Sequence, residues 1–411
     1  MHDAVIRGGT IVDGTGQPAF TGDIAIRDGT IVEVGGHLGA ARRTVDAAGL
    51  LVTPGWIDIH THYDGQATWD AELAPSSWHG ATSLLLGNCG VGFAPVRRAD
   101  RDRLIELMEG VEDIPGITLA EGLAWDWETF PEYLDALDRL PRTLNVAAQV
   151  PHHALRVFVM GERGLHREQA RGDDIREMHR LTAEALAAGA FGFTTSRTDQ
   201  HKTTAGEFVS GRHAHVDELL GIGAALADCK SGVFGINNDF EDETAEFDWM
   251  ERLARQTQRP VWFTLSDRPA DPARWRRLVS QLRRVRASGA PLMGQVVGRP
   301  VGVLLGFQTS LNPFSVRDGY EALEGLAPAQ RLDRLRDPAV REQILGSKPS
   351  ARKVQTLSPS HQAIQAAWDR MFLLSDPPDY EPTPDSTVAA VAARVGLKPD
   401  EVAYDHMLGN D

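Results

Sequence analysis

The sequence predicts an α/β fold: a (β/α)8 TIM-like barrel with about seven strands present, together with a small N-terminal β-sandwich half. Two patterns predict this architecture. Residues 4–36 alternate apolar and polar side chains, which is typical of strands with one buried face. From residue 56 onward, apolar strand-like runs alternate with longer helical stretches. Such alternation indicates a parallel sheet whose strands are joined by helices, and barrels are built in this way.

The N-terminal β layer is predicted to span residues 1–54. Its two clearest strand segments are VIRGGTIVDG and DIAIRDGTIVEVG, and Asp28-Gly29 in the second is a hairpin turn signal. The segment AAGLLVTPG closes the layer before the pattern changes. We therefore expect a small layer that forms part of a composite β-sandwich.

The barrel is predicted over residues 55–411. Near-continuous apolar runs, expected for strands buried on both faces, cover residues 56–62, 82–89, 144–151, 191–196, 232–237, 260–266 and 292–298. Helices are expected at residues 173–189, 250–258 and 273–288, and Gly189 can end the first of them. After residue 298 the sequence becomes helical and loop-like, which predicts a helical insertion and an incomplete barrel without a visible eighth strand.

Composition narrows the range of partners. The 411 residues carry a formal net charge of −15, so a nucleic acid would be repelled. No segment reaches the apolar length of a membrane span, and the first residues lack the basic and apolar regions of a secretory signal. The two cysteines, Cys89 and Cys229, imply no disulfide framework. We expect a cytoplasmic protein with no nucleic-acid or membrane partner, for which an oligomer is possible.

The stretch GWIDIHTHYDGQ, residues 55–66, places two histidines directly after an apolar run. Side chains two residues apart on a strand point to the same face, so His60 and His62 would share one face. Two neutral imidazoles on one face can hold a metal ion. The alternative is a pair of core histidines, each with its own polar partner.

A second candidate ligand follows the next apolar run, in LLLGNCGVGFAP. Cys89 is flanked by glycines, which let the backbone come close to a ligand or to a neighbouring strand. A thiolate binds Zn²⁺ well, and metal binding lowers the pKa of the thiol. By itself Cys89 is more simply interpreted as a small buried core residue. The His-x-His pair on the preceding strand favours the ligand interpretation.

Several other polar residues follow predicted strands. His152, or His153 beside it, could polarise a substrate carbonyl or bind a carboxylate, and either is also compatible with an exposed loop. His201 after the fourth strand is a weaker case of the same kind. Arg299 after the seventh strand could bind a substrate carboxylate through a bidentate contact, although a solvated surface arginine is the simpler interpretation. The acidic residues between 100 and 140 are interpreted as a solvated helix face.

These segments resemble the amidohydrolase superfamily. GWIDIHTH, preceded by TIVDGTG, GDIAIRDGTIVEVG and GLLVTPG, matches its N-terminal pattern. HTHYDGQ followed by GNCGVGFAPVR is similar to the N-acyl-D-amino-acid deacylase (D-aminoacylase) branch, in which a cysteine after strand two binds zinc. The specific motifs run from about residue 4 to the third or fourth strand, and weaker ones continue beyond.

The resemblance implies a zinc-binding (β/α)8 barrel that hydrolyses amide bonds through a metal-activated water. It makes His60, His62 and Cys89 metal ligands and puts His152 where the family has a histidine after strand three. Family members also carry histidine ligands after strands five and six, where this chain reads GINNDF and FTLSDR, so their replacements stay open. The catalytic residue is unassigned, because the family's aspartate after strand eight would lie beyond residue 411 of an apparently C-terminally truncated relative.

The predicted function is zinc-dependent amide hydrolysis with one or two zinc ions. The expected substrate is a small N-acyl amino acid or related amide, contacted by His152 and Arg299. Two alternatives are open. One is a catalytically inactive or partner-dependent homologue that binds metal or ligand. The other is a cyclic-amide or dipeptide hydrolase of the same superfamily.

Overall fold

The structure is a computed structural model that describes residues 1–410 except 204, 269–270, 299–301, 310–311, 357–361, 363–364 and 366. The chain divides into two compact units. The first comprises Met1–Thr61, Asp70–Leu85 and Pro141–Ala147, and the second comprises His62–Trp69, Leu86–Leu140 and Ala148–Asp411. The predicted division at residue 54 stays a prediction.

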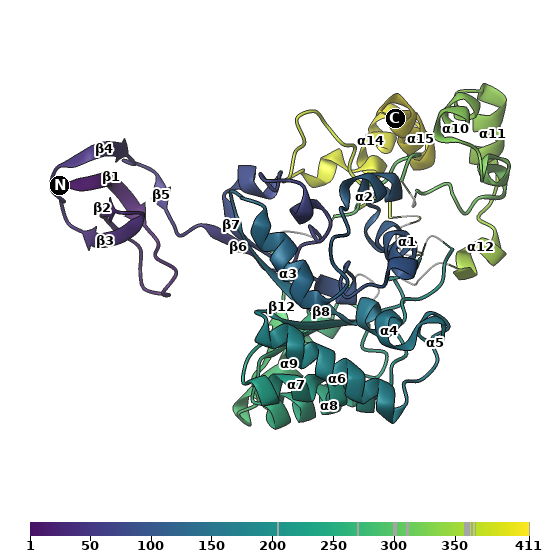
Figure 1. Ribbon diagram of the computed structural model, residues 1–411. Coiled ribbons are helices and arrows are strands. Elements are labelled where there is room, and N and C mark those ends of the chain that lie inside the picture. Colours follow the sequence, from purple (N-terminus) through teal and green to yellow (C-terminus); the bar gives the residue numbers. More distant parts are fainter. Residues whose placement is uncertain are drawn as a thin grey trace. The chain divides into compact units, whose positions relative to one another are not determined.

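The N-terminal sheet belongs to the first unit (Figure 1). Its strand order is β3-β2-β1-β4, and the short β5 also pairs with β1. The strands are β1 (His2–Ile11), β2 (Phe20–Arg27), β3 (Thr30–Gly35), β4 (Ala41–Asp46) and β5 (Leu51–Val52). Asp28 and Gly29 join β2 to β3 with φ angles of 51° and 72°. Two successive positive φ angles suit a tight hairpin, so the predicted turn is confirmed.

All seven predicted barrel strands are present, in the sheet order β12-β11-β10-β9-β8-β7-β6. They are β6 (Trp56–Asp58), β7 (Ala81–Leu86), β8 (Asn145–Pro151), β9 (Gly192–Arg197), β10 (Val233–Asn238), β11 (Val261–Thr264) and β12 (Leu292–Gln295). The pairing is parallel between β6 and β7 and between successive strands from β8 to β12. Because paired strands run in the same direction, their carboxyl ends lie along one edge of the sheet.

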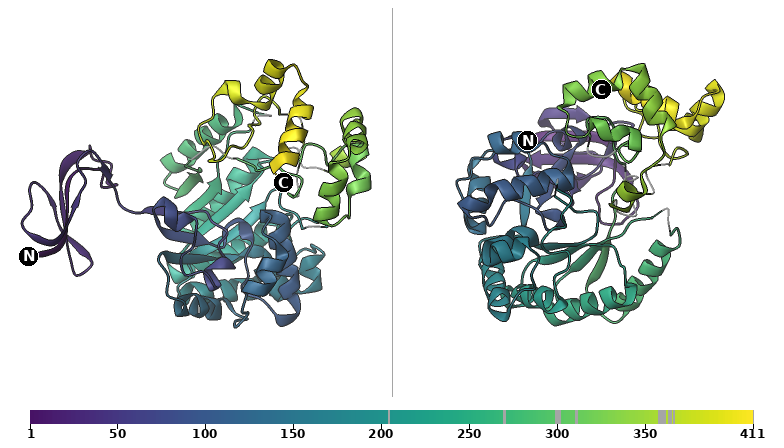
Figure 2. Two further views of the ribbon diagram at one scale, coloured as in Figure 1. Left: turned by 90° about the horizontal axis from the view of Figure 1, so that it is seen from above. Right: turned by 90° about the vertical axis from the view of Figure 1, so that its right-hand side faces the viewer.

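Helices of the second unit form an outer layer along β9–β12, which Figure 2 shows from two further sides. They are α6 (Gly172–Ala187), α7 (Val216–Cys229), α8 (Glu243–Thr257) and α9 (Arg274–Ala287). Phe193 and Phe234 lie on neighbouring strands with ring centroids 5.0 Å apart, and Phe263 of β11 contacts Phe247 of α8 at 5.4 Å. These buried rings fix the distance between the helical layer and the sheet.

The remaining helices lie between strands or follow β12. Those before α6 are α1 (Arg101–Glu112), α2 (Gly116–Gly122), α3 (Phe130–Arg139), α4 (His152–Met160) and α5 (Glu162–Leu165). Those after β12 are α10 (Pro328–Leu335), α11 (Pro338–Gly346), α12 (Ala351–Thr356), α14 (Val388–Val395) and α15 (Pro399–Asn410). The predicted helical character after residue 298 is confirmed, and this region buries its own apolar core, which includes Phe307, Phe314 and Tyr404.

Helix length and composition also bear on membrane insertion. Across the part of the chain that the structure describes, no helix combines the length and apolar character required to cross a bilayer.

Candidate metal centre

A glycine-rich turn directly after β7 places Cys89. Gly87 has a φ of 73°, and a Cβ there would lie 2.0 Å from the carbonyl oxygen of Gln149, so only glycine fits. Cys89 itself has a φ of 57°, a left-handed conformation that few non-glycine residues adopt. The Gly90 N–H donates to Thr194 Oγ1 at 3.0 Å and ties the turn to β9. The thiol is therefore held in a buried position, 5% exposed, at the end of its strand.

Cys89 is one of three side chains that converge within the second unit. Its Sγ, a carboxylate oxygen of Glu112 and a ring nitrogen of His201 all lie within 4.8 Å of one another. His62 joins them through Glu112, whose Oε1 lies 3.1 Å from His62 Nε2. We call these four residues, His62, Cys89, Glu112 and His201, the Cys89 cluster. Sulfur, imidazole nitrogen and carboxylate oxygen are the donor types that bind zinc in proteins.

Glu112 is the last residue of α1, and the helix phase explains its direction. Leu104 and Met108 are buried, and Glu112 follows at the same four-residue spacing, so it continues the inward face. Its side chain is 21% exposed. The interpretation of the acidic residues between 100 and 140 as a solvated helix face is thus wrong for Glu112. The periodicity of the buried residues was the signal that could have identified it.

His201 reaches the Cys89 cluster from the loop after β9. Its Nδ1 lies 2.8 Å from Ser196 Oγ, and its Nε2 lies 3.2 Å from Asn237 Nδ2. The same Asn237 amide group donates to Cys89 Sγ at 3.7 Å, and its oxygen accepts from Thr264 Oγ1 at 2.8 Å. Asn237 is at the end of β10, the fifth strand, where the resembled family has a histidine. A histidine from the preceding loop therefore lies beside that position.

Electrostatics in the Cys89 cluster disfavour net negative charge. Burial, together with the nearby carboxylates of Asp64 and Asp113, raises the pKa of Glu112 to about 8. Burial and the charge of Glu112 also raise the pKa of the Cys89 thiol. Asp64 has its pKa raised to about 7 by burial, against the stabilising N–H of Gly87. A bound cation would remove this penalty, so the cluster fits a metal ion electrostatically as well as by donor type.

His60 belongs to the first unit, and the second unit begins two residues later at His62. His60 is partly buried, and its backbone N–H donates to Asp58 Oδ1 at 3.3 Å. Next to it, Thr61 bonds the carbonyl of Leu85 through both its N–H and its hydroxyl, which fixes the end of β6 against β7. The ligand role of His60 stays a prediction.

His152 is the first residue of α4 and is 1% exposed. Its Nδ1 lies 2.7 Å from Thr195 Oγ1 and its Nε2 lies 2.8 Å from Glu218 Oε1. Glu218 also pairs with Arg156, whose Nε is 3.0 Å away, and both side chains are 1% exposed. A substrate could reach His152 only by breaking one of these contacts. The substrate-binding role of His152 stays a prediction. Arg299, the other residue predicted to contact the substrate, lies outside the described residues.

Acid sensitivity is expected from His153, which is 5% exposed and accepts the Ser210 N–H at Nδ1, 2.9 Å away. Burial, with the charge of Arg156, lowers the pKa of His153 to about 3. In the unfolded chain the His153 imidazole has its usual pKa of about 6.5, so below that pH the unfolded chain binds a proton that the folded chain does not bind. The contribution of His153 to stability is therefore complete above pH 6.5 and is lost as the pH falls toward 3. Between pH 7.5 and 5 this loss lowers the free energy of unfolding by about 2 kcal/mol.

The measurement is urea unfolding of the wild type and His153→Asn at these two pH values. Asparagine supplies an amide oxygen as acceptor without a titrating ring, so the variant should lose less stability on acidification by the stated amount. The exposed His166→Asn serves as the control and should behave as wild type. An equal pH dependence in His153→Asn and wild type would contradict the assignment.

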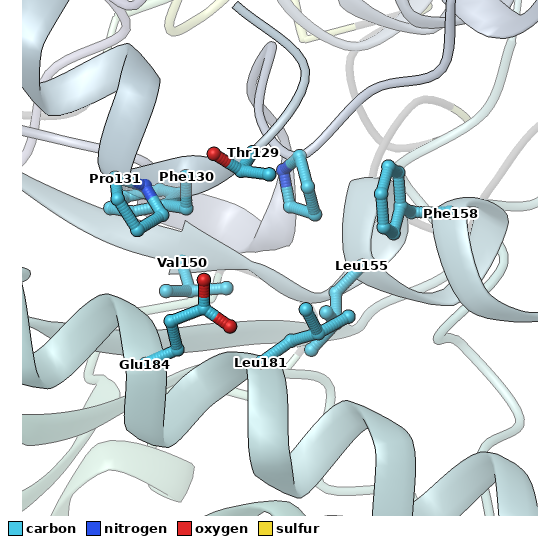
Figure 3. Close-up of a pocket in the computed structure, with 9 residues that line it drawn as sticks. Thr129, Phe130, Pro131, Val150, Leu155, Phe158, Leu181 and Glu184 are labelled. Carbon is cyan, nitrogen blue, oxygen red and sulfur yellow. The ribbon is translucent and has the colours of Figure 1, made fainter.

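Figure 3 shows a small depression on the second unit. Phe130, Val150, Leu155, Phe158 and Leu181 contribute most of its lining. The one carboxylate at its rim, that of Glu184, pairs with Arg180 at 2.8 Å. None of the residues of the Cys89 cluster lines it. Its space is comparable to one water molecule, so it is a packing defect and does not hold an amino-acid derivative.

The fold and the cluster define a class of protein. A parallel α/β sheet with polar side chains gathered at the carboxyl ends of its strands is the arrangement of barrel enzymes. The chain belongs to the amidohydrolase family, whose model matches residues 43–393. The predicted family and fold class are thereby confirmed.

The chain is similar to individual members of this family over part of its length. The chain is 36% identical over 194 residues to a D-aminoacylase of Alcaligenes xylosoxydans xylosoxydans. This match covers 47% of the chain and 37% of that protein. A crystal structure of D-aminoacylase, 27% identical, superposes with a TM-score of 0.59 over 73% of this chain and 59% of that one. The chain therefore spans little more than a third of the length of the curated relative.

One further structure shares the fold. It is N-acyl-D-glutamate deacylase from Bordetella bronchiseptica, complexed with zinc and a phosphonate inhibitor. It is 23% identical, with a TM-score of 0.58 over 98% of this chain and 69% of that one.

Proposed function

We propose that this chain carries the metal-binding barrel of an amide hydrolase that acts on small N-acyl amino acids or related amides. The observation that carries the proposal is the Cys89 cluster at the carboxyl ends of the parallel strands. Family membership and the similarity to D-aminoacylase support the reaction class. Zinc is the proposed metal, as one or two ions, because the donor set includes a thiol and imidazoles, and because a deacylase of the same fold is complexed with zinc.

His60, His62 and Cys89 are the proposed metal ligands. When bound there, zinc would lower the pKa of a water molecule and polarise the scissile carbonyl. The chain's own contribution is to hold the donors in place. Asp64 Oδ1 accepts the Gly87 N–H at 2.7 Å and so fixes the start of the Cys89 turn. Ser196 sets the ring orientation of His201, as outer-shell partners of ligating histidines commonly do.

The substrate and the cellular setting are proposed at a coarser level. A small N-acyl amino acid fits the relatives, and the family fold does not by itself fix the side chain or the stereochemistry. The low cysteine content supports a reducing compartment, and we propose the cytoplasm. We place no nucleic acid among the partners because of the chain's negative charge.

The test combines metal analysis with an activity assay on N-acetyl-D-amino acids. We expect bound zinc together with release of acetate. Bound zinc without turnover would favour a metal-binding homologue that lacks activity. Turnover of cyclic imides or of β-aspartyl dipeptides instead would favour the other chemistry of the superfamily.

The two cysteines give a matched pair of variants. Cys89→Ser should weaken zinc binding by at least about 100-fold, because it removes a proposed ligand, and outer-shell changes alone cost about 10–100-fold. Cys229, at the end of α7, donates to the Ala183 carbonyl at 3.6 Å, away from the Cys89 cluster, so Cys229→Ser should bind zinc as wild type does. Zinc affinity is measured by chelator competition. Equal affinities for the two variants would make Cys89 a structural residue.

A further inference from the structure

We propose that Glu112 and His201, together with Cys89, form a set of metal ligands that replaces the histidines absent from the ends of the fifth and sixth strands. The proposal rests on the proposed function, since both concern one metal centre. It goes further by assigning as ligands two residues that the resemblance does not. The ligand class is a divalent cation of borderline softness, with Zn²⁺ as the expected ion.

The distances between the donor atoms are close to those around a bound metal ion. Around a tetrahedral zinc with bonds of about 2.0–2.3 Å, neighbouring donor atoms lie about 3.4–3.8 Å apart. The donor atoms of Cys89, Glu112 and His201 already lie within 4.8 Å of one another. The three donor atoms are therefore already close to ligand spacing.

The origin of the three residues is the second argument. They come from the turn after β7, from the end of α1 and from the loop after β9, so 112 residues separate the first from the last. As metal ligands, Glu112 would be a carboxylate and Cys89 a thiolate, and two negative charges close together where water is largely excluded need compensation. A shared cation supplies that compensation to both.

The surroundings of His201 are the third argument. Ser196 lies against Nδ1, which leaves Nε2 on the side of Asn237 and Cys89. Thr264 holds the amide of Asn237, and that amide contacts both His201 and Cys89. A histidine held at Nδ1 by a hydrogen-bond partner, with Nε2 directed at other donors, has the arrangement of a metal ligand with its outer shell in place. Asn237 thus lies beside the proposed site at the fifth strand end, and His201 contributes the imidazole.

The position of Glu112 is the fourth argument. The carboxyl end of a helix carries a partial negative charge, which is unfavourable for a carboxylate in the last turn. Even so, α1 ends on Glu112 with its carboxylate against His62 Nε2 and close to Cys89. The carboxylate therefore connects the His-x-His segment with the Cys89–His201 side of the Cys89 cluster, as a ligand of a shared centre would.

The experiment compares Glu112→Gln and His201→Gln with two matched controls. Glu121→Gln makes the same change at an exposed residue of α2, and His213→Gln makes it at an exposed residue of the loop that carries His201. Zinc affinity is measured by chelator competition, and visible spectra are recorded after Co²⁺ substitution. We expect an affinity loss of at least about 100-fold and an altered Co²⁺ spectrum for both test variants, since loss of outer-shell partners alone costs 10–100-fold. Both controls should keep wild-type values.

The outcomes separate this inference from the proposed function. Wild-type affinity and an unchanged Co²⁺ spectrum in Glu112→Gln and His201→Gln would overturn the inference. If Cys89→Ser still loses zinc in that case, the proposed function stands. Absence of zinc from the wild type would overturn both. Thermal unfolding of each metal-free variant checks that it folds. If Glu112→Gln does not fold, Glu112→Asp takes its place, and if His201→Gln does not fold, His201→Asn takes its place.

Discussion

Replacing His60 and His62 together by alanine is expected to abolish zinc binding. The two imidazoles follow the first barrel strand, and loss of two nitrogen donors leaves too few ligands to compete with water for the ion. Zinc content after dialysis is the measurement, and we expect it to fall to background. The control is a double substitution of two exposed histidines, His79→Ala with His166→Ala, which should retain the wild-type content.

Two results would count against this expectation. Unchanged zinc content in the double variant would refute the ligand assignment of the His-x-His segment. A lower zinc content in the control as well would point to an indirect effect on folding. To separate these cases, thermal unfolding of the two double variants is measured without metal. We expect similar unfolding temperatures, because neither double substitution removes a fully buried side chain.

Glu218→Gln is expected to destabilise the second unit by about 3–5 kcal/mol, the typical cost of leaving one member of a buried ion pair alone. Glu218 lies within 3.0 Å of both Arg156 Nε and His152 Nε2, and all three side chains are 1% exposed. The neutral amide leaves the guanidinium charge of Arg156 without its counter-ion in a low-dielectric environment. The other contacts of Arg156, to the carbonyl and hydroxyl of Ser210 and to the Glu168 carbonyl, are with neutral groups and do not neutralise it.

Urea unfolding at neutral pH measures this loss. The control makes the same chemical change at Glu184, whose pair with Arg180 is half exposed and should contribute about 0.5 kcal/mol or less. A loss in Glu218→Gln no larger than in the control would mean that the pair is not desolvated. Lower zinc affinity with unchanged stability would instead place Glu218 in contact with the metal centre.

Much of the fold was predictable from local pattern. Apolar runs of strand length are recognisable in a sequence, and for this reason all seven barrel strands were predicted, including the short β11 and β12. The expected burial on both faces is wrong for β6, whose three residues are exposed. The Asp28-Gly29 turn was predictable because its backbone conformation demands those residue types. Cys89 and His62 were predictable as neighbours for a related reason, since parallel strands end at one edge of the sheet.

Other parts of the site depend on contacts between distant segments. Glu112 belongs to a helix between the second and third barrel strands, and periodicity can place it on the inward face, whereas only packing shows that its carboxylate meets His62 and Cys89. His201 belongs to a loop, and loop direction has no periodic signal. The pairing of His152 with Glu218 joins residues 66 positions apart, and nothing in the local sequence of either indicates the other.

The sequence by itself determined the α/β alternation, the family pattern and the residue types that can bind a metal, because strand burial and motif spacing are local properties. Tertiary structure alone decided which carboxylate and which further histidine approach Cys89, because that depends on how a helix end and a loop pack over the strand ends. Local periodicity sets which face a residue occupies, whereas long-range packing sets what that face meets.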